Sequence, residues 1–332
     1  MSVKTKAFLL LVTATIIWGV SSPLNRYALM NIHPWSFSAF RYLFGTVALL
    51  PLALRLGHRQ APANYYFDQV SRLEWLKAGL CLGVLLTLGS CFQFFGLTIT
   101  TASKSSFITS LYVSMVALFG FVLGQIPRLK VWIGLFLCMI GLAFIGNVGG
   151  ESSFNRGDAL TLIADLLWAT HMMTMGYFAI RVNPWKLVAS QSAVCSLISF
   201  GVAYWTDTLP TMAQFGKVWP ILAWGIMSVS VAYVCQAMAQ INSSPTATAV
   251  IMQFQPILGA TCGVIFLNEK VSLPMVIGAV FLITGALIAQ RAGDCFRLER
   301  GHPKFRLVMV ARFLVGISIL SACGLSMVLT AA

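Results

Sequence analysis

The chain has 332 residues, of which 58% are apolar or aromatic and 9% are charged, and its mean hydropathy is +0.84. A globular domain in water carries about a quarter charged residues. One soluble core of this size cannot hide so much apolar surface, so most of that surface must face lipid. The composition excludes a disordered chain, a secreted disulfide scaffold and a soluble Rossmann or barrel enzyme. It predicts an all-α polytopic membrane protein.

The net charge of +13 would suggest a nucleic-acid partner in a soluble protein. In a membrane protein the basic residues instead indicate orientation, because Lys and Arg concentrate on the cytoplasmic side. With the N-terminus in the cytoplasm, most of the 22 Lys and Arg residues fall in cytoplasmic segments. We therefore expect no nucleic-acid partner. We expect an integral protein of the bacterial inner (plasma) membrane, surrounded by the lipid bilayer.

The eight cysteines are scattered, and no two of them are closer than ten residues. No CxxC pair and no Cys/His cluster occurs in the sequence, so the pattern predicts neither a zinc site nor a redox pair. Seven of the eight lie in apolar runs, where Cys behaves as a small hydrophobic residue. We expect no metal and no cofactor.

Apolar runs between charges and helix breakers predict eleven membrane-spanning helices. Each has about 18 to 25 residues, enough to cross a bilayer core of ~30 Å. The first run follows Lys4 and Lys6 without a cleavage site, so it is interpreted as an uncleaved span and not as a signal peptide. The predicted spans are roughly 7–30, 35–55, 75–99, 105–124, 130–147, 158–180, 186–205, 218–241, 246–267, 272–290 and 313–332.

Trp, Pro and Gly residues recur in the same order in the two halves of the chain. At an offset of 150 residues, Trp18 aligns with Trp168, and residues 32–35 align with residues 182–185. Between the second and third predicted spans the offset changes, in a region where a loop tolerates insertions and deletions. The pairs that then align, at an offset of 144, are Trp75 and Trp219, Gly134 and Gly278, and Gly141 and Gly285.

Each copy of the repeat holds five predicted spans. Because five is odd, the two copies would cross the membrane in opposite directions, related by a pseudo-two-fold axis in its plane. Inverted repeats of this kind characterise secondary transporters, whose substrate site lies near the midplane between the halves. We therefore predict two inverted five-helix repeats, or ten transmembrane helices, at residues 1–150 and 151–291. A basic linker and an eleventh, C-terminal helix follow at residues 292–332.

Short motifs in both halves resemble those of the EamA-type branch of the drug/metabolite transporter superfamily. The resemblance covers residues 7 to about 290 and implies a ten-helix carrier that usually exports small metabolites through a central cavity lined by both halves. The motifs that carry it are Trp18-Gly19, Phe40-Arg41-Tyr42, Thr101-Ala102-Ser103, Trp168-Ala169, Ser244-Pro245, Gln255-Pro256, Leu267-Asn268-Glu269, Gly278 and Gly285.

The sequence departs from the family pattern at two places. Gln125 occupies the position of an acid in the first copy, whereas the second copy keeps Glu269. Residues 313–332 add an uncharged run beyond the family's tenth span, and a crossing there would place the C-terminus outside. An amphipathic helix is the alternative, although the run has no charged face. Glu269 itself ends the ninth span beside Lys270, and we expect these two residues to form a solvated interfacial pair.

Two titratable residues lie deep in the sixth span, where a charge costs several kcal/mol and is a functional candidate. Asp165 could couple transport to protons or cations, or bind a substrate amine; a structural carboxylate paired with a neighbouring helix is the alternative. His171 lies six residues later, about 120° around the helix, and need not share its face. A core histidine bonded to a carbonyl group is the alternative to a proton relay there.

Two positions in the first two spans are further candidates. Arg41 could bind a substrate carboxylate, although packing and snorkelling to the outer interface would also explain it. Asn25 follows Pro23, whose missing donor is expected to interrupt the first helix and free backbone carbonyls toward the cavity. A simple kink is the alternative.

Uncharged polar and aromatic residues complete the predicted cavity. Amides and phenols give oriented hydrogen bonds at modest desolvation cost, which suits an amphiphilic or aromatic metabolite, although each could instead bond two helices together. Trp18 and Trp168 could form aromatic walls or be packing residues that mark the repeat. The uncharged polar candidates are Gln93, Tyr112, Tyr233, Gln236, Gln253 and Gln255.

The sequence thus predicts a secondary-active transporter of a small-molecule substrate, such as an amino acid or a related solute, working by alternating access. Proton or cation coupling and a homodimer are compatible with it. A membrane-embedded enzyme acting on lipid or peptide would need a nucleophile with a base, or a metal cage. The sequence contains no HExxH, GxSxG or P-loop motif, so we do not expect an enzyme or an ATP-driven pump. A channel is a third alternative.

Overall fold

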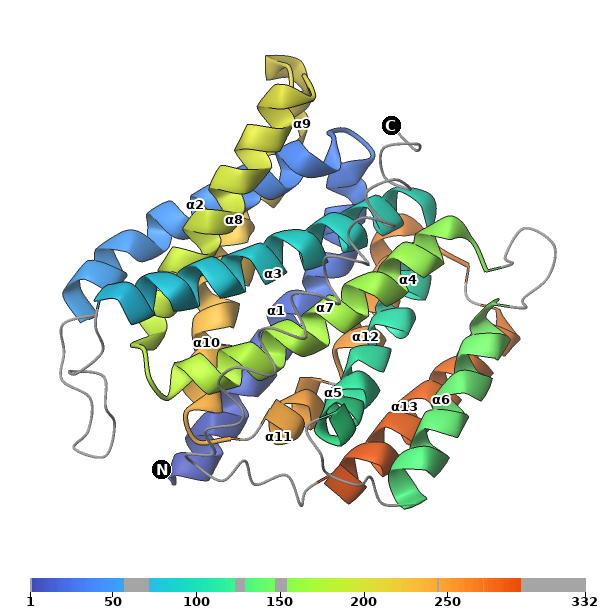
Figure 1. Ribbon diagram of the computed structural model, residues 1–332. Coiled ribbons are helices and arrows are strands. Elements are labelled where there is room, and N and C mark those ends of the chain that lie inside the picture. The colour runs from blue at the N-terminus through green and yellow to red at the C-terminus, as the bar shows by residue number, and fades with distance from the viewer. Residues whose placement is uncertain are drawn as a thin grey trace.

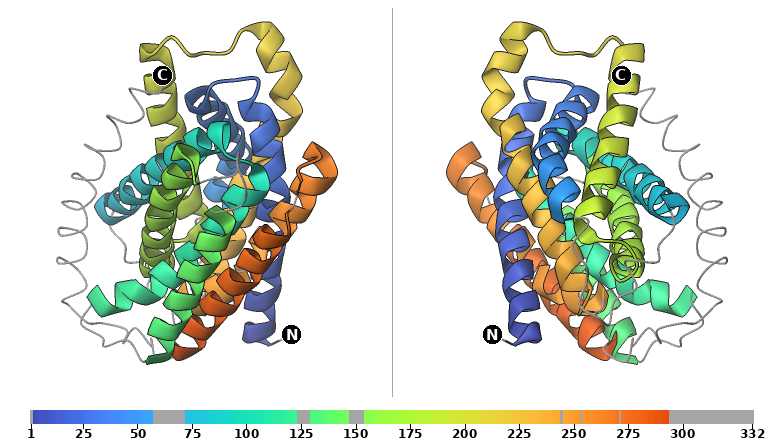
Figure 2. Two further views of the ribbon diagram at one scale, coloured as in Figure 1. Left: turned by 90° about the vertical axis from the view of Figure 1, so that its right-hand side faces the viewer. Right: turned by 90° about the vertical axis from the view of Figure 1, so that its left-hand side faces the viewer.

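The computed structural model describes residues 2–56, 72–122, 129–146, 154–243, 245–252, 254–270 and 272–293. Within these ranges every regular element is a helix, and the helices pack side by side in one bundle (Figures 1 and 2). The prediction of an all-helical protein is therefore confirmed for the part of the chain that the structure describes. Gln125, the basic linker and the predicted eleventh span at 313–332 lie outside the described residues.

The described helices overlap the first ten predicted spans in sequence position. Those of residues 2–146 are α1 (Val3–Leu29), α2 (Pro34–Leu56), α3 (Arg72–Ile99), α4 (Ala102–Thr109), α5 (Leu111–Val122) and α6 (Leu129–Gly146). Those of residues 154–293 are α7 (Arg156–Ala179), α8 (Pro184–Trp205), α9 (Met212–Ala223), the π-helix η3 (Ile226–Val231), α10 (Ala232–Gln240), α11 (Pro245–Met252), α12 (Gln255–Leu267) and α13 (Leu273–Gly293).

Several described stretches have the length and composition of membrane spans. Five are long and apolar enough to cross a bilayer, and shorter apolar helices accompany them at Trp132–Gly141, Gln255–Leu267 and Leu273–Gly285. The five long stretches are Thr5–Leu29, Pro34–Leu56, Glu74–Ile99, Pro184–Trp205 and Met212–Gln240.

Equivalent turns start α2 and α8. Both helices begin at a proline, which suits the first helical position because its missing N–H would have no partner there. The next backbone N–H is capped from the residue before the proline. Trp35 N donates to His33 Nδ1 at 3.4 Å, and Trp185 N donates to Asn183 Oδ1 at 3.0 Å. The aligned sequences at an offset of 150 residues therefore adopt the same local structure.

The predicted interruption of the first span at Pro23 is wrong, because α1 runs through Pro23 as one continuous helix. The Gly19 carbonyl, which would otherwise accept a hydrogen bond from residue 23, lies beside Gly259 of α12. Helix α1 packs along its length against α10 and α12. Such packing supplies most of the stability of a helix inside a protein, so a single missing hydrogen bond does not end it.

The interruptions lie instead at corresponding positions of two other spans. The predicted span 105–124 is divided at Ser110 into α4 and α5, and the predicted span 246–267 is divided between α11 and α12. At each division a backbone N–H donates back three residues. Ser110 N donates to Phe107 O at 3.1 Å, and Phe254 N donates to Ile251 O at 3.4 Å. These two positions are separated by 144 residues, the offset of the repeat.

Helices α6 and α13 make a reciprocal contact. A methyl group added at Gly141 would lie 2.6 Å from the carbonyl oxygen of Gly278, and one added at Gly285 would lie 2.5 Å from that of Gly134. Gly134 aligns with Gly278, and Gly141 aligns with Gly285. The repeat therefore relates the two contacts to each other, with α6 and α13 exchanging roles. An exchange of this kind is expected of two helices that pack about a local two-fold axis.

Candidate functional site

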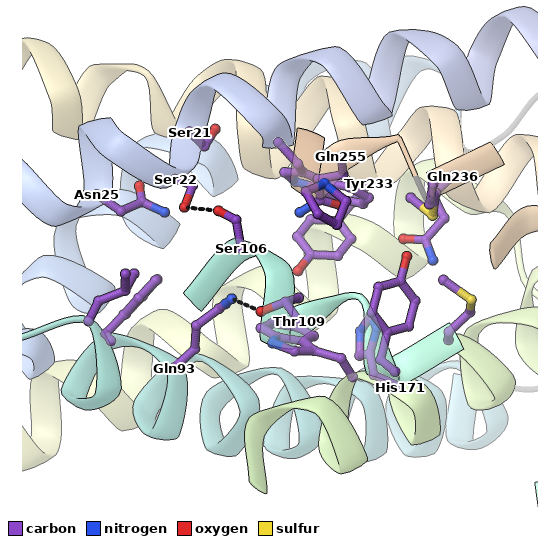
Figure 3. Close-up of a pocket in the computed structure, with 18 of the residues that line it drawn as sticks. Ser21, Ser22, Asn25, Gln93, Ser106, Thr109, His171, Tyr233, Gln236 and Gln255 are labelled. Atoms are coloured by element: carbon purple, nitrogen blue, oxygen red, sulfur yellow. Dashed lines mark hydrogen bonds between the residues drawn. The ribbon is translucent and has the colours of Figure 1, made fainter. Parts of the chain in front are cut away.

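A cavity of about 850 Å³, counting space open to solvent, lies between the helices of residues 2–122 and those of residues 154–256 (Figure 3). Asp165 does not line it, and Gln253 lies outside the described residues. No three His, Cys, Asp or Glu side chains in the described ranges gather as a metal site. The predicted site residues that line the cavity are Trp18, Asn25, Arg41, Gln93, Tyr112, Trp168, His171, Tyr233, Gln236 and Gln255.

Aromatic side chains from both halves form one end of the cavity. The rings of Trp18 and Tyr233 meet edge to face with their centroids 4.9 Å apart, and His171 lies 5.7 Å from Tyr233 and 5.9 Å from Trp168. Edge-to-face pairs of this kind are favourable beyond the area that they bury. The Trp18 indole is also fixed, because its Nε1 donates to the backbone carbonyl of Ser228 at 2.9 Å.

His171 has a partner behind the cavity wall. Its Nε2 lies 3.0 Å from Oε1 of Gln191 in α8, and both side chains are buried. An amide partner of this kind fixes the orientation of the ring. Its contact with Tyr233 therefore joins a positioned imidazole to the aromatic end of the cavity.

Small polar groups form the other end of the cavity, as Figure 3 shows. The hydroxyl groups of Ser22 in α1 and Ser106 in α4 lie 2.8 Å apart. Gln93 Nε2 in α3 donates to Thr109 Oγ1, immediately before the division between α4 and α5, at 3.4 Å. The cavity therefore has small polar groups at one end and, at the other, rings together with the amides of Gln236 and Gln255, and the divided helices contribute to its wall.

Arg41 does not snorkel to the outer interface, in contrast to one of the two roles considered from the sequence. Its side chain is 6% exposed and lines the cavity. Its Nε donates to Oγ of Ser228 in the π-helix at 3.2 Å, and its guanidinium carbon lies 5.7 and 5.5 Å from the ring centroids of Phe37 and Phe94. The side chain turns inward because α2 packs against η3 along this face.

Asp165 was expected in the cavity, and the structure instead places it behind the cavity wall. The side chain is fully buried and has no charged partner among the described residues, and the Thr109 hydroxyl lies close enough to donate a hydrogen bond to its carboxyl group. Thr109 and Tyr112 flank the division between α4 and α5. The Thr109 hydroxyl is the donor within reach of the carboxyl group, and Tyr112 interacts with that group electrostatically. Both line the cavity, so they separate Asp165 from it.

A cluster of charges that the sequence did not predict joins the halves at the end of the bundle where α4 and α7 begin. Lys104 Nζ lies 2.6 Å from Asp158 Oδ2, and Thr100 Oγ1 donates to Asp158 Oδ1 at 2.6 Å. Asp158 also belongs to the capping box that starts α7 with Asn155. The Asn155-x-x-Asp158 spacing could have indicated that helix start, but no sequence signal links Asp158 with Lys104.

The predicted solvated pair of Glu269 and Lys270 is wrong. The carboxylate of Glu269 turns back to the first turn of α4, where it accepts hydrogen bonds from the backbone N–H groups of Ala102 at 2.7 Å and Ser103 at 2.8 Å. The first N–H groups of a helix have no partner within the helix and carry partial positive charge, so they attract a carboxylate. Glu269 therefore connects the end of α12 to α4.

The sequence has relatives among known proteins. An uncharacterized transporter of Archaeoglobus fulgidus is 25% identical over 86% of this chain and 97% of its own length. The uncharacterized transporter YvbV of Bacillus subtilis is 26% identical over 85% and 90%. An S-adenosylmethionine uptake transporter of Rickettsia prowazekii is 24% identical over 81% and 87%.

A solved structure and a protein-family model also match this chain. A solved crystal structure superposes with a TM-score of 0.62 at 17% sequence identity, covering 89% of this chain and 99% of the other, so the two share a fold. Residues 5–147 and 155–290 each match the EamA-like transporter family. These two segments span most of the sequence, and the chain therefore belongs to the EamA-like transporter family of the drug/metabolite transporter superfamily.

Proposed function

We propose that the protein is a secondary-active transporter that carries small metabolites across the membrane by alternating access to the cavity between its halves. The observation that carries this proposal is the pair of divided spans. Their interruptions lie at Ser110 and Phe254, at corresponding positions of the two copies, and residues beside both line the cavity. Discontinuous helices at equivalent positions of two repeats are typical of transporter substrate sites.

The proposal includes two inverted repeats of five spans, at residues 1–150 and 151–291. The matching starts of α2 and α8 and the reciprocal glycine contacts of α6 and α13 support this arrangement. Two quasi-equivalent halves can exchange conformations, so that the cavity would open to either side of the membrane in turn. The distribution of Lys and Arg supports a cytoplasmic N-terminus.

The proposed direction is export of amino acids or related solutes, as is usual in the family. The name of the Rickettsia relative states uptake of S-adenosylmethionine by that protein. Members of one family therefore need not share a direction, and the test must measure flux both ways.

Asp165 is the proposed coupling residue. A carboxyl group that is fully buried in a span and has no ion-pair partner among the described residues is costly when charged and is a candidate to bind a proton or cation. Its neighbours Thr109 and Tyr112 flank the division between α4 and α5. Protonation or deprotonation of Asp165 would therefore change the interactions of the two residues that flank this division of the helix.

Transport by the purified protein in proteoliposomes tests the proposal. We expect saturable flux of at least one radiolabelled compound from a panel of amino acids, organic acids, nucleosides and amines, measured in both directions with and without a pH gradient. Protein-free liposomes and a Trp18→Ala variant, which removes one aromatic wall of the cavity, are the controls. Equal flux in all three preparations for every compound would refute a carrier function.

A further inference from the structure

We infer that the cavity recognises a singly charged organic carboxylate, with the guanidinium group of Arg41 as its anion-binding group. This inference rests on the proposed transport function and names the substrate class. Arg41 is the single Lys, Arg, Asp or Glu side chain among the described residues that line the cavity. Apart from the imidazole of His171, the other lining groups are neutral amides, hydroxyls, rings, and aliphatic or thioether side chains. The charge of the lining side chains therefore makes the electrostatic potential in the cavity positive.

The charge of Arg41 is left without an acidic partner among the described residues. Taking a cation out of water is costly unless it is paired, and buried charges in proteins normally are. Buried Lys104 follows this rule, because its Nζ lies 2.6 Å from Oδ2 of Asp158. Arg41 is equally buried, but its neighbours among the described residues are uncharged: two phenylalanine rings, the Ser228 hydroxyl, and the side chains of Tyr42, Tyr233 and Cys195. These neutral contacts offset part of the desolvation cost and leave the charge free for a ligand.

The contacts of Arg41 determine which of its N–H groups remain available to a ligand. Its Nε is engaged by Ser228 Oγ, and the rings of Phe37 and Phe94 hold the guanidinium carbon. The two terminal nitrogens have no protein acceptor among the described residues. Two parallel N–H groups at the end of a guanidinium match the two oxygens of one carboxylate.

Ser228 also joins this anion site to the aromatic end of the cavity. Its hydroxyl accepts from Arg41 and its backbone carbonyl accepts from the Trp18 indole. Both contacts come from the π-helix η3, a local structure that is frequent at functional sites. A carboxylate bound at Arg41 could therefore place an apolar or aromatic body against Trp18 and Tyr233, whose rings meet at 4.9 Å. Because no carboxylate is found among the described lining residues, an amino group on the ligand is not required.

Binding of matched probes to the purified full-length protein tests this inference. The probes are 3-phenylpropanoate, its amide and 3-phenylpropylamine, hexanoate with its amide and amine, and phenyl phosphate. The shift in the midpoint of thermal unfolding measures binding, since a ligand that prefers the folded state stabilises it. We expect the two carboxylates to raise the midpoint more than their amides, their amines or phenyl phosphate.

Variants at Arg41 decide whether that residue is responsible. Arg41→Gln should weaken carboxylate binding by about tenfold or more, because a hydrogen bond to a charged group is lost. Arg41→Lys keeps the charge but loses the two parallel N–H groups of the guanidinium, so the carboxylate affinity of this variant should lie between those of Arg41→Gln and the wild type. If Arg41→Gln does not fold, Arg41→Lys alone provides the test. Arg26→Gln is the matched control, because Arg26 is partly buried in α1 but does not line the cavity.

The inference is overturned if neither carboxylate binds, if amides, amines or phenyl phosphate bind as well as the carboxylates, or if both Arg41 variants bind carboxylates like the wild type. Its failure is distinguishable from failure of the proposed function. Saturable flux of a neutral or cationic compound in proteoliposomes would leave a transporter with a different substrate. Carboxylate binding that depends on Arg41, without any flux, would leave a binding protein that does not transport.

Discussion

Lys104 of α4 and Asp158 of α7 form a buried ion pair, with 2.6 Å between Nζ and Oδ2, that connects the two halves of the chain. Their side chains are 9% and 0% exposed, respectively. With Glu269 at the first turn of α4, the pair closes a network of contacts at one end of the bundle. In the proposed alternating-access cycle, contacts between the halves at this end would have to break for that end to open.

Removing one partner of this pair should be strongly destabilising. Asp158→Asn, which keeps a capping side chain for α7, and Lys104→Met should each cost about 3–5 kcal/mol, because each removes the opposite charge from a buried ion. The double variant should cost less than the two single variants together. Thermal unfolding of the purified variants measures the effect, with exposed Asp207→Asn as the control. Additive costs would show that the two charges do not interact.

Glu269 should stabilise the start of α4. Glu269→Gln removes the charge and keeps one accepting oxygen, but it replaces the other with an NH2 donor that faces a backbone N–H. It should therefore cost more than the about 0.3–1 kcal/mol of the helix dipole. Glu269→Ala should cost more, because it also leaves backbone N–H groups of Ala102 and Ser103 without their acceptor. Unfolding midpoints of these variants and of Lys270→Gln provide the measurement. A larger effect for Lys270→Gln than for Glu269→Ala would restore the solvated pair expected from the sequence.

The reciprocal contact of α6 and α13 predicts equal sensitivity on both sides. Gly141→Ala and Gly285→Ala would each place a methyl group within 2.6 Å of a backbone carbonyl oxygen. Each should destabilise by about 1–3 kcal/mol, as overpacking does. Gly201→Ala is the matched control, because a methyl group there meets nothing within 4 Å, and it should be neutral or slightly stabilising. Tolerance of Gly141→Ala together with sensitivity of Gly285→Ala would contradict the two-fold contact.

Asp165→Asn should separate coupling from substrate binding. Asp165 lies behind the wall formed by Thr109 and Tyr112 and does not line the cavity, so the affinity for substrate should change little. Accumulation driven by a pH gradient should be lost, while exchange without a gradient persists. The ratio of internal to external substrate in proteoliposomes measures this, and exchange in the same vesicles is the control. Unchanged accumulation in Asp165→Asn would exclude this residue as the coupling site.

The sequence predicted where helices lie better than how they are interrupted. Apolar runs mark the positions of the spans because lipid requires them. The divisions at Ser110 and Phe254 lie within such runs, and no proline or charge marks Ser110. Pro23 did carry a breaker signal, but packing against α10 and α12 keeps α1 continuous.

The candidate site was predictable as a set of residues and not as a geometry. Polar side chains inside apolar spans are few, so choosing them identified Arg41, Gln93, Tyr233 and other lining residues. The rotation of each helix depends on its neighbours, and this rotation decides that Asp165 lies behind the wall. Contacts between distant segments, such as Lys104 with Asp158, leave no pattern in a single sequence.

Counterflow in proteoliposomes is the most direct test of alternating access. Vesicles are loaded with an excess of an unlabelled substrate found in the flux panel and diluted into a trace of the labelled compound. A carrier that alternates between two sides must exchange one molecule for another, so labelled substrate should accumulate transiently above its external concentration and then decline. Entry that never exceeds the external concentration, at a rate independent of the unlabelled load, would contradict the mechanism and indicate a channel.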